Sequence, residues 1–279
     1  MIGPRVGLRA GPKAGPAAGP GADEIGSSGT DPMAGVTRDA TSSIYCPATL
    51  AEWATTRSAA GVPAGAALAI WGFQESATPV ADASGNGITL TVSGSPTFQA
   101  VVSGWTRLAI TYADAATGSI LSGNAALPDI STTSFLVIGY IKFPAAAPAA
   151  ARNLLEVGTA GANRGAAEAL NTSVARAISA GNTANGASNP FTGAVRPVVV
   201  RVNRTASTFA AMTDQDKMAP TFGAAMTGKA VNFNAVAAGN TSIAGGELYG
   251  AAFSGAAAEL TDAQVKAVLQ TLGWSIAWS

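Results

Sequence analysis

The stretch LAIWGFQESATPVADASGNGITLTVSG, residues 68–94, decides the fold class that this sequence predicts. Both of its ends are apolar and rich in β-branched and aromatic residues, which favour extended strands. Between them, the side chains of Asp82 and Asn86 can cap their own turn. Glycine permits a positive φ, so the chain can reverse tightly here. The stretch therefore predicts a strand and a tight turn before the next strand, with the turn formed by Asp82, Ser84, Gly85, Asn86 and Gly87.

Similar short apolar runs, separated by Gly, Asn, Pro and Ser, recur along the rest of the chain. We expect strands at 66–73, 87–92, 106–112, 134–143, 152–157, 171–178, 195–202, 207–213, 231–236 and 246–253. Many short strands with turn signals between them are typical of a β-sandwich rather than of alternating β/α units. Within 134–143, one side of the strand is apolar and is predicted to face the core: Phe135, Val137, Ile141 and Phe143.

Two short helices are predicted to flank these strands. The first begins at a Thr49–Glu52 capping box, ends near Gly61 and has an apolar face formed by Leu50, Trp53 and Ala54. The second begins at Thr261, with Gln264 completing its capping box, and ends at Gly273. Its apolar stripe is predicted to pack against the edge of the sandwich: Val265, Val268, Leu269 and Leu272.

The composition excludes several classes of function. The 279 residues include 16 basic and 16 acidic side chains, so no net charge attracts nucleic acid or a membrane. Histidine is absent, which removes the commonest acid–base catalyst and metal ligand. The single cysteine, Cys46, precludes an intramolecular disulfide and is expected to be structural. We predict no cofactor, no membrane span and, because Gly3 and Pro4 interrupt the apolar start, no secretory signal peptide.

Residues 2–21 form five consecutive tetrads, IGPR, VGLR, AGPK, AGPA and AGPG, and residues 1–43 are predicted to be an extended arm and linker. Proline and glycine make an irregular ribbon that does not order by itself. We therefore expect a partner subunit to hold the arm through Arg5, Arg9 and Lys13, although a solvated linker is the alternative. A ribbon of this length reaches about 60 Å, enough to cross a neighbouring subunit.

Residues 44–279 resemble the laminin-G/concanavalin A-like jelly-roll family in three places. These are the 68–94 stretch with its Asp-x-Ser-Gly-Asn-Gly turn, the paired run VVVRVNRTASTFAAMT, and the closing GGELYGAAFSGAAAELTDAQVKAVLQTLGW. The resemblance implies an all-β jelly-roll sandwich. Some relatives bind calcium at the sandwich rim, but calcium takes about six to eight oxygen ligands and no acidic cluster lies near Asp82, so we predict a turn without a metal.

The same resemblance includes glycanases, yet the sequence does not predict an enzyme. The Glu-x-Asp-x-x-Glu strand of such enzymes is missing, and a glycosidase needs two carboxylates across the scissile bond. Apart from Glu52 of the first predicted helix, the domain's glutamates are widely separated in sequence: Glu75, Glu156, Glu168, Glu247 and Glu259. Asp214 and Asp216 are closer together, but they are predicted to be solvated residues of a hairpin loop. We expect no catalytic residue.

Two non-enzymatic functions therefore stand as hypotheses. The first is a structural protein of a bacteriophage virion, a decoration or fibre jelly roll in a homo-oligomer or symmetric assembly, anchored to neighbouring capsid or other virion subunits by its arm. The alternative is a lectin-like module that binds a host-surface glycan. Sugar sites often pair an aromatic ring with polar groups, and Trp105, at a loop-to-strand edge, is the candidate contact. Trp71 and Trp274 lie in apolar patterns that predict core positions.

Overall fold

A computed structural model describes residues 31–113, 120–123, 125–159, 161–234 and 245–279. The chain divides into two units, residues 1–31 and 32–279. The arm residues Arg5, Arg9 and Lys13 lie outside the described residues. No helix in the described part of the chain is long and apolar enough to cross a membrane.

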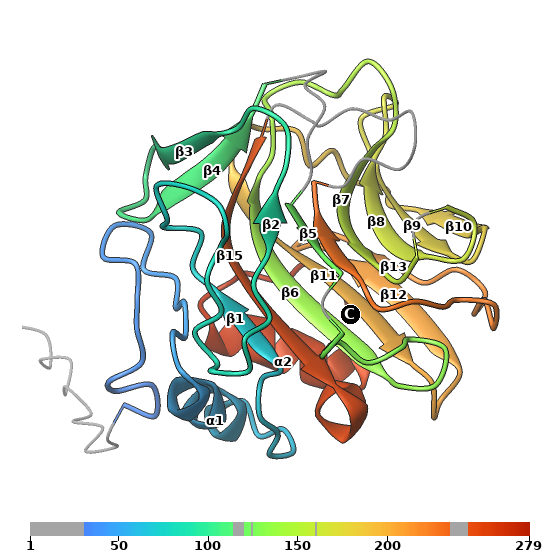
Figure 1. Cartoon of the computed structure of the whole chain (residues 1–279), viewed down its shortest axis with the longest axis horizontal. Helices are drawn as coiled ribbons and strands as arrows, with labels where there is room; N and C mark the ends of the chain where they lie inside the picture. The colour runs from blue at the N-terminus through green and yellow to red at the C-terminus, as the bar shows by residue number, and fades with distance from the viewer. Residues whose placement is uncertain (1–30, 114–119, 124, 160, 235–244) are drawn as a thin grey trace, which may run out of the picture. The chain divides into compact units, whose positions relative to one another are not determined.

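Two antiparallel sheets build the second unit, which confirms the predicted all-β sandwich (Figure 1). Among the described residues, the eight-stranded sheet contains β1 (Ala69–Trp71), β3 (Thr97–Val101), β4 (Leu108–Tyr112), β6 (Phe135–Lys142), β11 (Val195–Asn203), β12 (Thr208–Met212), β13 (Lys217–Met218) and β15 (Gly245–Ser254). The seven-stranded sheet contains β2 (Thr91–Val92), β5 (Ile120–Ser122), β7 (Arg152–Val157), β8 (Gly165–Ala169), β9 (Ala175–Ser179), β10 (Asn182–Asn185) and β14 (Val231–Phe233).

The main core lies between the sheets. The predicted inward side of β6 is confirmed, because Phe135, Val137, Ile141 and Phe143 all belong to this core. The Phe233 side chain of β14 points toward the eight-stranded sheet, where its ring packs edge-on against Trp71. Gly139 leaves room for that ring, since a Cβ there would lie 2.8 Å from Phe233 Cε1. Close approach of the two sheets therefore depends on a glycine opposite an aromatic ring.

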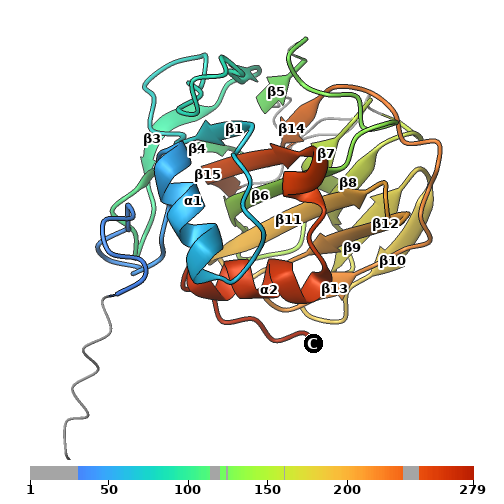
Figure 2. The same cartoon turned by 90° about the horizontal axis from the view of Figure 1, so that it is seen from below.

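A second apolar layer covers the outer face of the eight-stranded sheet (Figure 2). It includes both helices, α1 (Leu50–Ala59) and α2 (Asp262–Thr271), the latter following a 3-10 turn at Gly255–Ala258. The capping box of Thr261 and Gln264 is confirmed, and the predicted stripe of α2 is buried. The stripe packs with Ile138 and Tyr140, however, so α2 lies on the face of the sheet and not at its edge.

Helix α1 differs from its prediction. Thr49 caps it by accepting from the Glu52 amide, but the Glu52 carboxylate accepts from the amides of Thr37 and Ala48 instead of closing a capping box. Of the predicted apolar face only Trp53 is buried, while Leu50 and Ala54 are exposed. The helix turns its Trp53 side to the sheet because that indole donates to the Tyr249 hydroxyl at 2.8 Å, with Thr56 and Arg57 buried beside it.

The domain begins before the predicted boundary at residue 44. Asp39, predicted to lie in the linker, is buried and its carboxylate accepts hydrogen bonds from the amides of Thr106 and Arg107 at 2.8 Å. Burial opposes ionisation of Asp39, but hydrogen bonds from the Thr106 hydroxyl, from the amide and hydroxyl of Ser42 and from the Arg107 amide outweigh it. They hold the pKa of the carboxyl well below its usual range. The buried Asp39 carboxylate therefore ties residues 32–43 to the sandwich.

Candidate functional site

The outer face of the seven-stranded sheet carries a group of polar side chains, unlike its inner face. Side chains alternate along each strand, so while Leu155 and Val157 of β7 enter the core, Glu156 points outward. Some outward positions of the neighbouring strands also carry polar side chains. They include Asn153 of β7, Glu168 of β8, Arg176 of β9 and Asn232 of β14. We call these residues, together with Arg164, the polar cluster.

Strand register aligns four polar residues across the sheet. Asn153 pairs with Glu168, Glu168 pairs with Arg176, and Arg176 pairs with Asn185 of β10. Side chains at directly opposed positions lie close enough to interact. Four strands therefore contribute one continuous row of hydrogen-bonding groups.

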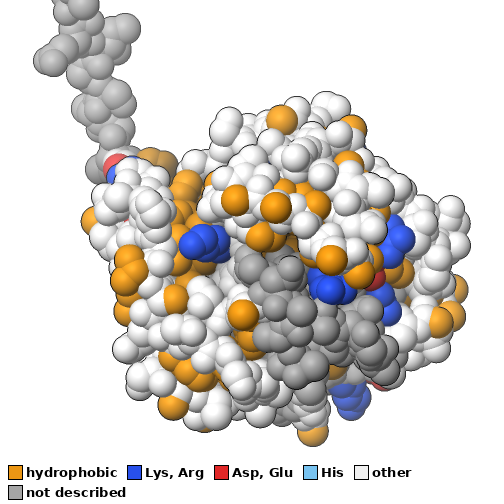
Figure 3. Space-filling model, turned by 90° about the horizontal axis from the view of Figure 1, so that it is seen from above, with side chains coloured by type: hydrophobic (Ala, Val, Ile, Leu, Met, Phe, Trp, Pro, Cys, Tyr) orange, Lys and Arg blue, Asp and Glu red, His pale blue; other side chains and the backbone are white. Residues whose placement is uncertain are grey.

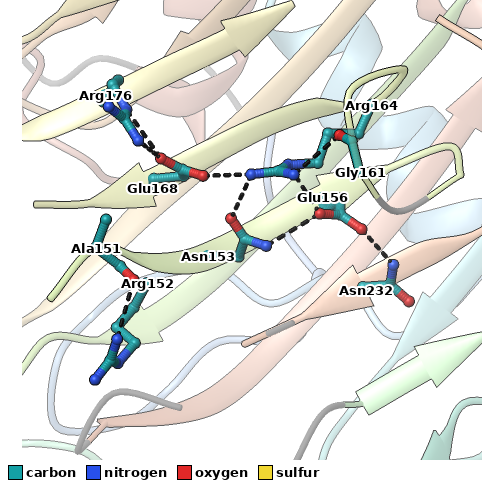
Figure 4. A network of polar contacts seen from close by, with 9 residues as sticks. All are labelled: Ala151, Arg152, Asn153, Glu156, Gly161, Arg164, Glu168, Arg176 and Asn232. Atoms are coloured by element: carbon teal, nitrogen blue, oxygen red, sulfur yellow. Dashed lines mark hydrogen bonds and ion pairs between the residues drawn. The ribbon is translucent and has the colours of Figure 1, made fainter. Parts of the chain in front are cut away.

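Arg164, at the end of the β7–β8 connection, links the two carboxylates of the cluster (Figure 4). Its Nε lies 3.1 Å from Glu156 Oε2 and its Nη2 lies 2.6 Å from Glu168 Oε1. Arg176 binds the other oxygen of Glu168 through Nε, at 2.9 Å, and through Nη2. Glu168 thus has an arginine on each carboxylate oxygen, which is a strong charge-assisted arrangement.

Two asparagine amides complete the network around Glu156. Asn232 donates to Glu156 Oε1 at 2.9 Å, and Asn153 donates to Glu156 Oε2 at 3.1 Å. Burial raises the pKa of Glu156, and the Arg164 charge and the Asn232 hydrogen bond offset only part of this effect. Glu156 and Glu168 are buried, whereas the Arg176 side chain is 29% exposed. The network therefore leaves Arg176 partly exposed to solvent and fixes it through the buried Glu168 carboxylate.

The structure corrects the prediction that the glutamates are isolated. Glu156 and Glu168 are separated in sequence, yet adjacent strands bring both to Arg164. Sequence reasoning also missed Arg164, Arg176 and Asn153. The available signal was one charged residue between two alanines in GAAEA and in ARAIS, which marks an outward position once the segment is known to be a strand.

The 82–87 turn connects parts of the scaffold. Gly85 and Gly87 have φ of +86° and +72°, the positive values expected from the sequence. The Asp82 carboxylate accepts from the amides of Ile70 and Ile88, both at 3.0 Å, and of Ser84 at 2.8 Å. Asn86 donates to the Leu68 carbonyl at 2.8 Å. Asp82 thus fastens β1 to the turn, and no group of three or more metal-ligating side chains occurs among the described residues.

Trp105 lies away from the polar cluster, in the layer that covers the eight-stranded sheet. It is half-buried, with its ring centroid 6.1 Å from that of Trp274 and 6.3 Å from that of Tyr140. Its role as a glycan contact stays a prediction.

Asp214 and Asp216 are also engaged. Asp214 pairs with Arg196 at 2.6 Å, and Asp216 accepts from the Ser188 amide at 2.9 Å, so neither is a freely solvated carboxylate.

No protein-family model and no curated protein sequence matches this chain. Its fold resembles that of Trypanosoma rangeli sialidase solved in complex with sialic acid, with a TM-score of 0.54 and 8% identity, over 75% of this chain and 33% of the sialidase. It also resembles the binding domain of botulinum neurotoxin DC solved with rat synaptotagmin II, with a TM-score of 0.52 and 12% identity, over 74% of this chain and 51% of that one. The chain thus spans a third of the sialidase and half of the toxin domain. These likenesses show a shared β-sandwich fold.

Proposed function

We propose that this chain is a carbohydrate-binding module without catalytic activity, and that the glycan lies over Arg176 and Asn185 on the outer face of the seven-stranded sheet. The observation that carries the proposal is the row Asn153–Glu168–Arg176–Asn185, in which a buried carboxylate holds a partly exposed arginine. Asn185 and Thr183 of β10 are exposed beside it.

Sugars are recognised through hydroxyl groups that need donors and acceptors at fixed positions. Arg176 supplies donors, and Asn185 supplies both a donor and an acceptor. Because Glu168 already orders the guanidinium, a ligand loses less free energy in ordering the side chain. A rigid polar row built on strands is thus better suited to binding than the same groups on loops.

The fold gives coarse support for this proposal. The sialidase neighbour was solved with sialic acid and the toxin binding domain with rat synaptotagmin II, so this fold occurs in proteins solved with a sugar or with a protein ligand. The two neighbours are only 8% and 12% identical to this chain, so the location of the site is argued from the polar cluster.

Binding fits the cluster better than hydrolysis does. A glycosidase needs one carboxylic acid that can protonate the leaving group and a second carboxylate that acts as base or nucleophile. Here Arg164 binds both Glu156 and Glu168, and both are almost completely buried. Neither carboxyl group can approach a glycosidic oxygen without breaking the network.

The virion role stays a separate prediction, since it depends on the arm. Deleting residues 2–21 tests it. We expect lost incorporation into particles with an unchanged melting temperature, and full incorporation of the truncated chain would contradict that role.

A glycan array tests the binding proposal. The wild-type chain is expected to bind a defined set of glycans, and Arg176→Ala is expected to lose most of that signal. Arg38→Ala is the matched control, because Arg38 is an exposed arginine in the 32–43 segment, outside the polar cluster. Absence of binding by the wild-type chain, or equal binding by Arg176→Ala, would overturn the proposal.

A further inference from the structure

The Arg176 guanidinium uses one side and leaves its end open. Its Nε and Nη2 both bind Glu168 Oε2, so the side edge of the group is occupied. Nη1 makes no hydrogen bond or ion pair within the described part of the chain. A guanidinium carries five N–H groups. The two on Nη1 and the second on Nη2 therefore form an unused fork at the end of the side chain.

The surroundings of this fork contain little negative charge. Strands β9 and β10, ARAIS and NTAN, have no acidic residue. The carboxylates of the cluster lie on the other side, where Glu168 is shared by Arg164 and Arg176. Asp216 approaches β10 at Gly186, but it already accepts from the amides of Ala187 and Ser188 and from the Ser188 hydroxyl. The end of Arg176 thus has no carboxylate of its own.

Basic side chains are also visible on the end of the sandwich seen from above. Figure 3 shows Lys and Arg in several places on that surface and very little Asp or Glu. The surface seen in Figure 3 therefore carries few carboxylates that would repel an anionic ligand.

From this geometry we propose that the ligand is a glycan bearing a carboxylate, received end-on by Nη1 and Nη2 of Arg176, with Asn185 beside it. The inference rests on the proposed function and names its substrate class. A planar guanidinium fork matches a planar carboxylate through two parallel hydrogen bonds. A neutral glycan would leave this charged end without a partner.

A carboxylate-to-ester comparison tests the inference. The array carries sialylated and uronic-acid-terminated glycans, each as the free acid and as the methyl ester, with sulfated and neutral glycans beside them. We expect the acids to bind at least about tenfold more tightly than their esters, as loss of a charge-assisted pair implies. Arg176→Gln should abolish this difference. Arg176→Lys, which keeps the charge but loses the fork, should retain only part of it.

The outcomes separate this inference from the proposed function. Equal binding of acid and ester would overturn the inference and leave glycan binding intact, as would a preference for sulfated glycans. No binding to any glycan would overturn both. The comparison of acids with their methyl esters uses the wild-type chain, so it does not depend on whether Arg176→Gln folds. Asn185→Ala, a change at an exposed side chain, gives a second test and should weaken the acids several-fold.

Discussion

The outer faces of the two sheets differ. On the eight-stranded sheet, apolar side chains and two helices form a second core, with Trp53 fully buried. On the seven-stranded sheet, the outward side chains form a charged network that ends at the partly exposed Arg176. The two sheets share one inner core, so the difference lies entirely in what each presents outward. One sheet acts as support, and the other displays a rigid polar surface.

Removing the Trp53 side chain should have the largest effect on stability. Trp53→Ala leaves a cavity between α1 and the sheet and deprives the Tyr249 hydroxyl of its indole donor. Substitutions of this kind cost about 4 kcal/mol. Urea denaturation measures the loss, and glycan affinity should be unchanged wherever the variant is folded. A loss below about 1 kcal/mol would mean that the helical layer does not support the sheet.

Glu247 is a carboxyl group buried in the shared inner core. It is buried on β15 between Ile110 and Ile141, and its Oε2 has no hydrogen-bond partner among the described residues. Burial raises its pKa from 4.5 to about 8. Between these two pH values the folded chain binds more protons than the unfolded chain. The free energy of unfolding is therefore highest below about pH 4.5 and falls as the pH rises toward 8.

The comparison of Glu247→Gln with the wild type isolates this effect. Because a pKa unit corresponds to about 1.4 kcal/mol, the variant should be more stable by about 4 kcal/mol at pH 8 and equal to the wild type near pH 4. Denaturation curves across this range measure the difference. A pH-independent difference would show that Glu247 is not a buried neutral acid.

Glu168 should matter to both stability and binding. Glu168→Ala leaves two arginines without their shared carboxylate, at a cost of about 2 kcal/mol in unfolding free energy. It also frees Arg176, so glycan affinity should fall even though no ligand contact is removed. Glu168→Gln, which keeps the size and one acceptor, should be milder in both measurements. Unchanged affinity in Glu168→Ala would contradict the role of the network in positioning Arg176.

The smallest stability effect is expected at the rim of the site. Asn185 is exposed, so Asn185→Ala should change unfolding free energy by less than about 0.5 kcal/mol. Isothermal titration of this variant with a glycan ligand should nevertheless show several-fold weaker binding than in the wild type. Wild-type affinity in this variant would place the ligand elsewhere on the sheet.

The sequence predicts the fold class because its signals are local. Strand 134–143 alternates, the 82–87 turn has its glycines, and Thr261 with Gln264 forms a capping box. Strands β8 and β10 are not predicted, since GAAEA and NTAN have low β-propensity and form strands only by pairing with neighbours.

The polar cluster depends on information that the sequence does not contain locally. Glu156, Glu168 and Arg176 meet only through the register of three strands, including the irregularity between Asn153 and Leu155. A shift of one residue would turn Glu168 into the core. The outward charge of each strand is therefore readable in the sequence, but its partner is not.

The affinity of one glycan for the wild-type chain, Arg176→Ala and Arg38→Ala tests the central claim most directly. Isothermal titration with the strongest ligand from the array gives the three dissociation constants. We predict that Arg38→Ala matches the wild type and that Arg176→Ala binds at least about tenfold more weakly. Equal dissociation constants for all three chains would contradict the assignment of the binding site to the outer face of the seven-stranded sheet.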